Sequence, residues 1–256
     1  MVGGECLTGT GRFARRIGDR RALPALRRAL SSEYALLRSR SARSLANLGD
    51  QEAVPLLLAR FRTEPQDRVC VAYAAALGVF RVREALDGLL GLLERLDLDT
   101  LRGEAALAVA RLLGGEQYYV RLWRAARSDP GTALAEAVRR LRRRRELDPA
   151  VAAELSAAEQ AFARHDLGSG SAALARAIGR RPPGPLGAAP QAVLAACGRW
   201  LAGAGPARVD NLLLAMLGLH AAGLGGRRQD AAGEPNPAAA EKESDGDRNA
   251  NASGKE

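Results

Sequence analysis

The sequence is poor in cysteine and in long apolar runs, and each scarcity excludes a class of protein. The three cysteines in 256 residues lie too far apart for a zinc site or a thioredoxin-like redox motif. The longest apolar run, 212–219, falls short of the roughly 20 residues that span a bilayer. No charged-then-apolar leader is visible at the start. We therefore expect a cytoplasmic protein without membrane insertion, bound metal or cofactor.

Aromatic residues make up only 4% of the chain, and β-branched residues are also sparse. Leucine and alanine dominate instead, which favours packed helices over sheets. All but two of the 38 basic residues are arginine, and the net charge is +9. Residues 230–256 hold seven acids and three bases, so the cationic part precedes them. The composition predicts an all-α fold with an arginine-rich surface.

A repeat of 31 or 32 residues orders the first half of the chain. Apolar residues recur in register along three columns, which is the signature of a repeat architecture. The columns are Ile17, Leu48, Phe80 and Leu112; Ala14, Leu45, Leu77 and Val109; and Leu26, Leu57 and Leu89. Chance would not keep three such columns in phase.

Each period contains two helices, because the apolar residues within it follow helical spacing. Pro24 and Pro55 recur one period apart, where proline in the opening turn of a helix loses no hydrogen bond. Gly49 follows the second helix of a period and can take the left-handed cap conformation. Neither helix can bury its apolar stripe alone, so neighbouring pairs must stack.

Three stretches carry a resemblance to a known family: "RRIGDRRALPAL" from Arg15, "ARSLANLGDQEAVPLL" from Ala42 and "AAALGVFRVREALDGLL" from Ala74. The pattern resembles HEAT-like repeats, in particular the short bacterial type associated with phycobilisome lyases, over about residues 8–145. The third copy departs from it, with Arg81 where glycine is expected. The resemblance implies an α-solenoid of stacked antiparallel helix pairs.

Three segments follow from these patterns. Residues 1–147 form the predicted solenoid, and 148–225 form a C-terminal helical cap or a small helical domain. Within the second segment we expect a hairpin over 150–179 that is broken at Gly168–Gly170, then helices over 191–202 and 206–224. The polar residues 226–256 lack apolar surface and are predicted to be disordered.

The second helix of each pair lines the concave side of such a solenoid. The register assigns eight residues outside the apolar stripe to this side: Arg12, Arg16, Arg40, Arg43, Val79, Arg111, Arg139 and Arg143. Arginines flanking a small apolar centre suit a peptide or helix with acidic ends, because arginine pairs bidentately with carboxylates. We therefore expect a protein-binding scaffold, although the same arginines would also serve as a solvated face.

Several alternatives stay open at this point. The arginines of 139–146, and the helix that carries Tyr118 and Trp123, would fit a nucleic acid. Bacterial HEAT-like arrays also resemble domains appended to membrane transporters, and the family name suggests a bilin lyase-like subunit. His165 and His220 have no neighbour in sequence that would orient them for catalysis. We therefore expect no enzymatic activity.

Overall fold

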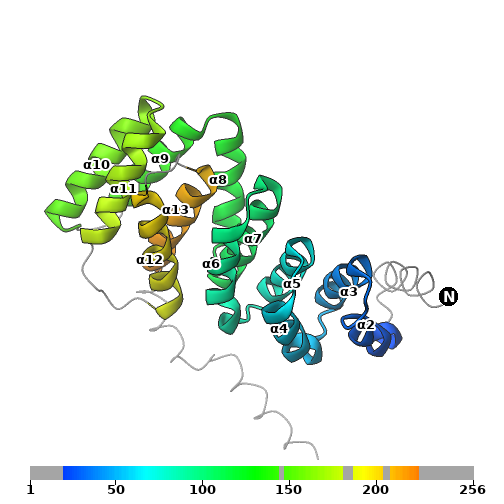
Figure 1. Cartoon of the computed structure of the whole chain (residues 1–256). Helices are drawn as coiled ribbons and strands as arrows, with labels where there is room; N and C mark the ends of the chain where they lie inside the picture. Colours follow the sequence, from blue (N-terminus) through cyan, green and yellow to red (C-terminus); the bar gives the residue numbers. More distant parts are fainter. Residues whose placement is uncertain (1–19, 144–146, 181–186, 204–207, 225–256) are drawn as a thin grey trace, which may run out of the picture.

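The computed structural model describes residues 20–143, 147–180, 187–203 and 208–224. These residues form twelve α-helices, three short 3-10 turns and no strand (Figure 1), which confirms the all-α class. The first six helices are α2 (Leu23–Ala29), α3 (Ala35–Asn47), α4 (Val54–Thr63), α5 (Asp67–Val79), α6 (Leu86–Arg95) and α7 (Asp99–Leu112). The others are α8 (Glu116–Ser128), α9 (Pro130–Arg142), α10 (Pro149–Ala163), α11 (Leu167–Arg180), α12 (Ala188–Ala202) and α13 (Val209–Leu224).

The first six helices form three antiparallel pairs, α2/α3, α4/α5 and α6/α7. Each first helix is preceded by a 3-10 turn: Arg20–Ala22, Gln51–Ala53 or Arg83–Ala85. Pro24 and Pro55 lie in the opening turns of α2 and α4, as their spacing predicts. The repeat in the sequence is therefore a repeat of helix pairs.

The curvature of the stack follows from which helices touch. The second helices α3, α5 and α7 pack extensively on one another, whereas α2, α4 and α6 pack mainly on their own partners. The second helices are therefore closer together than the first helices. A stack curves toward its more closely spaced row, so the second helices lie on the concave side. We call their solvent-facing side the inner surface, made of Arg40, Arg43, Ala75, Val79, Glu104, Leu107 and Arg111.

The apolar columns form a continuous core. Leu45, Leu57, Leu77, Leu89 and Val109 are fully buried, and Leu112 is buried. Leu48 and Phe80 pack against this core but stay half-buried, because each is the last, capping residue of its helix. The column that contains Ile17 begins outside the described residues.

The turns after the second helices share one backbone conformation. Gly49 and Gly114 both have φ +69°, the left-handed region that glycine adopts without strain. Arg81 stands at the equivalent turn after α5 and has φ +55°. The third repeat thus keeps the left-handed turn although it lacks the glycine, at a cost of about 1 kcal/mol or more.

The C-terminal helices return to the third pair. Helix α13 packs against α7, α8 and α9, and α12 packs against α6. The row of second helices therefore continues from α7 to α13, and α9 packs mainly on α10 and α8. Residues 211–218 are all buried, as expected for a helix that is apolar on every side.

Three predicted boundaries were wrong, and the first is that the helix expected over 191–202 begins at Ala188. The hairpin over 150–179 breaks at 164–166, where His165 has φ +59°, and not at Gly168–Gly170. Those glycines lie inside α11, and Gly170 serves packing because an added Cβ there would overlap the ring of Phe162. The last helix begins at Val209, and the polar tail 226–256 lies outside the described residues.

Candidate functional site

The inner surface brings together four of the eight residues assigned to the concave side, and Val79 is its apolar centre. Arg40 and Arg43 come from α3, Val79 from the end of α5 and Arg111 from the end of α7. Arg40 and Arg43 are exposed, Arg111 is half-buried and Val79 is 46% exposed. Four of the predicted residues thus share this surface, while Arg12 and Arg16 lie outside the described residues.

One ion pair crosses the inner surface. The Arg43 guanidinium donates to the Glu104 carboxylate at 2.7 Å, although 61 positions separate the two residues. Since α5 lies between α3 and α7, this pair passes over α5, where the register places Ala72 and Ala75. Small side chains leave room for it. Both partners remain about half exposed, so the pair contributes only about 0–1 kcal/mol to stability.

Arg139 and Arg143 do not continue this surface, because α13 and not α9 follows α7 in the inner row. They lie beside α10, around a separate hollow that Glu159 also lines. Burial alone would raise the pKa of Glu159, but hydrogen bonds from Arg139 and Arg142 outweigh it and lower the pKa. Two arginines of the 139–146 cluster therefore share one carboxylate of the protein itself.

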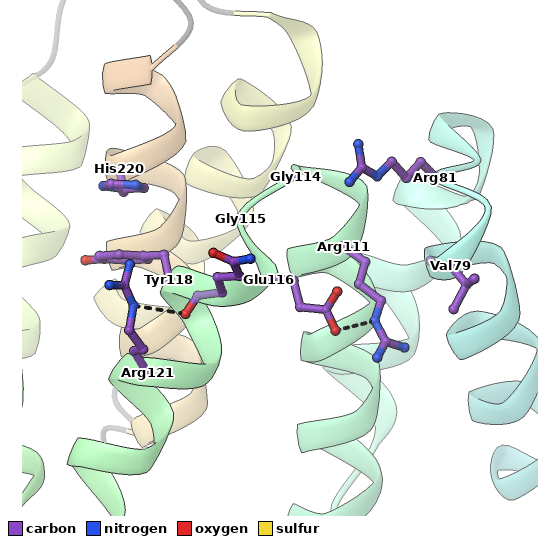
Figure 2. A pocket seen from close by; sticks show the side chains of 11 residues that line it. Val79, Arg81, Arg111, Gly114, Gly115, Glu116, Tyr118, Arg121 and His220 are labelled. Carbon is purple, nitrogen blue, oxygen red and sulfur yellow. Dashed lines mark hydrogen bonds and ion pairs between the residues drawn. The ribbon is translucent and has the colours of Figure 1, made fainter.

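A second hollow adjoins the inner surface at the turns that follow α5 and α7 (Figure 2). Its volume is about 470 Å³. We call it the arginine hollow; its lining includes Val79, Arg81, Arg111, Gly114, Gly115, Glu116, Gln117, Tyr118, Arg121 and His220. Val79 and Arg111 belong to both features. The hollow and the inner surface are therefore continuous.

Three guanidinium groups and one carboxylate set the charge of the arginine hollow. Arg111 donates to Glu116 at 2.8 Å, while Arg121 donates only to the Gln117 carbonyl oxygen at 3.3 Å. Arg81 is exposed, and its side chain makes no ion pair or hydrogen bond with the described residues. The side chain of Arg81 extends toward the Gly114 turn in Figure 2. Two of the three cations are therefore not neutralised by a carboxylate.

A stacked aromatic pair forms one side of the hollow. The rings of Tyr118 and His220 lie 4.0 Å apart and nearly parallel, at 2°, as Figure 2 shows. Sequence reasoning missed His220, because 102 positions separate it from Tyr118 and only the return of α13 joins them. The sequence did carry a signal for Arg81, which stands where the repeat has glycine.

The outer face of α8 offers less than its sequence suggests for a nucleic acid. Tyr119 is buried and Tyr118 is stacked on His220, which leaves Trp123 as the exposed aromatic residue of this helix. The Arg127 guanidinium lies 5.1 Å from the centroid of the Trp123 ring, a cation–π contact. Beside the half-buried Tyr118, this helix therefore has one exposed ring instead of a series of rings for stacking bases.

His165 has a partner that its sequence neighbours did not indicate. Its Nδ1 lies 3.4 Å from the Asp129 carboxylate, which also accepts the Thr132 backbone N–H at 3.0 Å and caps α9. That carboxylate has a lowered pKa, chiefly because Thr132 donates hydrogen bonds to it. Asp129 is distant from His165 in the sequence, and the arrangement is a helix cap with an exposed imidazole.

The two cysteines of the described residues are buried. Burial raises the pKa of Cys70 to about 11, and burial also raises the pKa of Cys197, so neither thiol is an activated nucleophile.

No three His, Cys, Asp or Glu side chains gather as a metal-binding group in the described parts of the chain. Among the helices described, none combines the length and apolarity needed to cross a membrane.

Comparison with known proteins gives one match. The family model for HEAT repeats matches residues 6–75, a range that ends within α5 and includes the first helix pairs. Comparisons with curated proteins and with solved structures give no significant match. The helix pairs and their stacking agree with this match, and the helices within the matched range are therefore HEAT-like repeats.

Proposed function

We propose that this protein is a non-enzymatic scaffold that binds an acidic peptide or amphipathic helix of a protein partner along the inner surface. The observation that carries the proposal is the exposure of Val79, 46%, between the arginines of α3 and Arg111 of α7. An exposed apolar side chain flanked by guanidinium groups matches a helix with apolar anchors and acidic ends. HEAT repeats commonly mediate protein interactions, which supports the same assignment.

The charges of the inner surface are available to a partner. Arg40 makes no ion pair with the described residues, and the Arg43–Glu104 pair is about half exposed. A partner carboxylate that replaces Glu104 exchanges one solvated pair for another, so the exchange costs little. Arginine suits this exchange because its planar fork binds a carboxylate through two parallel hydrogen bonds.

Site-specific photo-crosslinking tests the proposal. A photoreactive residue replaces Val79 in one variant and Leu56 in another, since Leu56 on the outer helix α4 is 44% exposed and serves as a matched control. Val79 should crosslink a defined partner in extracts of the native host, and Leu56 should not. Equal crosslinking at both positions would contradict the proposal.

Charge reversal then tests the arginines. Arg40→Glu with Arg43→Glu should weaken binding of the purified partner at least tenfold, because each change puts an acid where an acid docks. The control pair is Arg28→Glu with Arg62→Glu, two exposed arginines on the outer helices α2 and α4. A protein-binding site on the inner surface would be refuted if both double variants weakened binding equally. It would also be refuted if nuclease treatment abolished binding.

A further inference from the structure

The arginine hollow has the features of a site for one specific group of the partner. We propose that it binds a carboxylate side chain of the same acidic segment that the inner surface binds, and this inference rests on the proposed function. Val79 and Arg111 line both features. A segment that lies along the inner surface and continues past Val79 therefore enters the hollow.

The backbone of Arg81 supports a role for its side chain. Gly49 and Gly114 occupy the equivalent turns with φ +69°, and Arg81 adopts φ +55°. Glycine reaches this region without strain, whereas an arginine does so at a cost. A strained residue held at a turn suggests a function for its side chain, and here that side chain reaches the hollow (Figure 2).

The electrostatics of the hollow select an anion. Arg81, Arg111 and Arg121 supply three positive charges against the single carboxylate of Glu116, which pairs with Arg111. The guanidinium groups of Arg81 and Arg121 are not paired with a carboxylate in the described structure. A guest carboxylate gains charge-assisted hydrogen bonds from them without breaking an existing ion pair.

The aromatic pair limits the shape of the guest. Tyr118 and His220, whose rings stack on one another, both line the hollow. The methylene groups of a glutamate side chain can pack against these rings while its carboxylate faces the guanidinium groups. A glutamate on an extended peptide therefore fits the shape and the charge of this hollow.

The two histidines of the chain make binding directly observable. His220 lines the hollow, and His165 lies at the turn before α11, so His165 is an internal control. The full chain, labelled with ¹³C on histidine rings, is titrated with an acetylated deca-glutamate peptide in low salt. The ring signals of His220 should shift in a saturable way, and those of His165 should stay unchanged.

Variants assign the effect to the hollow. Arg81→Gly removes the cation and also the backbone strain, so it should weaken the peptide about tenfold, the loss expected for one charge-assisted hydrogen bond, without lowering the Tm. Arg121→Gln should also weaken binding. Arg83→Gln removes an exposed arginine two positions from Arg81 that does not line the hollow, and its Kd should equal that of the unmodified chain.

The contrary results are equally definite. The inference is overturned if the peptide shifts neither histidine or both alike, if Arg81→Gly binds as tightly as Arg83→Gln, or if pyrophosphate shifts His220 and the peptide does not. Its failure is separable from that of the proposed function. Partner binding that depends on Arg40 and Arg43 but not on Arg81 refutes the hollow alone, whereas a saturable His220 shift without crosslinking at Val79 refutes the inner surface alone.

Discussion

Arg102 joins the returning helix α13 to the solenoid, and its replacement is the sharpest test of the architecture. Its side chain is 5% exposed and donates to Asp210 at 2.6 Å and to Asn211 at 2.7 Å. It also donates to the carbonyl oxygens of Leu93 and Leu96, at the end of α6. One guanidinium group therefore holds three helices together.

Arg102→Met keeps the length of the side chain but removes all of these hydrogen bonds. The Asp210 carboxylate loses its buried partner, and breaking a buried pair costs about 3–5 kcal/mol. Asp210 remains 19% exposed, so water can solvate it in part, and we expect a loss near 3 kcal/mol. Amide hydrogen exchange should show α13 opening more readily than α3 and α5.

Urea unfolding followed by circular dichroism measures this loss. Arg95→Met is the matched control, because Arg95 pairs with Asp67 at the surface, where both side chains are about half exposed, and it should cost no more than about 1 kcal/mol. Asp210→Asn in the Arg102→Met background should restore part of the stability, since it removes the unpaired carboxylate. A loss below about 1 kcal/mol for Arg102→Met, or strict additivity of the two changes, would refute this account.

Three further predictions concern the core, a buried hydroxyl and acid. Leu77→Ala should cost about 2–5 kcal/mol in urea melts, since Leu77 is fully buried and its loss leaves a cavity; a loss under about 0.5 kcal/mol would mean that the repeat register is wrong. Tyr119→Phe should raise the Tm or leave it unchanged, because the buried hydroxyl has no hydrogen-bond partner among the described residues, and an unsatisfied buried hydroxyl is costly; a clearly lower Tm would show an unrecognised partner. Hydrogen bonds from Thr132 lower the pKa of Asp129, and hydrogen bonds from Ser169 lower the pKa of Asp166. The two carboxylates therefore add to the free energy of unfolding above the unfolded pKa of about 4, and this stabilisation is lost as the pH falls from there through the lower pKa of the folded state. The free energy of unfolding should therefore change less between about pH 5 and pH 3 in the double variant Asp129→Asn with Asp166→Asn than in the unmodified chain. An equal change in both proteins would contradict this role of the two carboxylates.

Local patterns in the sequence predicted the helix pairs correctly. The period of 31 or 32 residues predicted the alternation of helices and turns, and the positions of Pro24, Pro55 and Gly49 agree with it. The apolar columns form the core. Helical spacing and turn chemistry act between residues a few positions apart, so one sequence displays them directly. The same logic failed at Gly170, because a glycine that permits close packing looks in sequence like one that breaks a helix.

Part of the candidate site could also be predicted. Arg40, Arg43, Val79 and Arg111 share the inner surface because the register of stacked pairs carries each column onto one face. The register could not predict that Arg43 pairs with Glu104, since that pairing depends on the curvature of the stack. It also extended the column to Arg139 and Arg143, which the structure places beside α10.

The sequence by itself determined that this chain forms stacked helix pairs, that their second helices carry arginines, and that a later helix contains the longest apolar run, 212–219. Only the tertiary structure decided where that apolar helix is buried. Helix α13 takes the place beside α7, which removes α9 from the inner row and brings His220 to Tyr118. An apolar helix can bury its surface against many partners, and the choice depends on shape and on distant pairs such as Arg102 with Asp210, which no local pattern encodes.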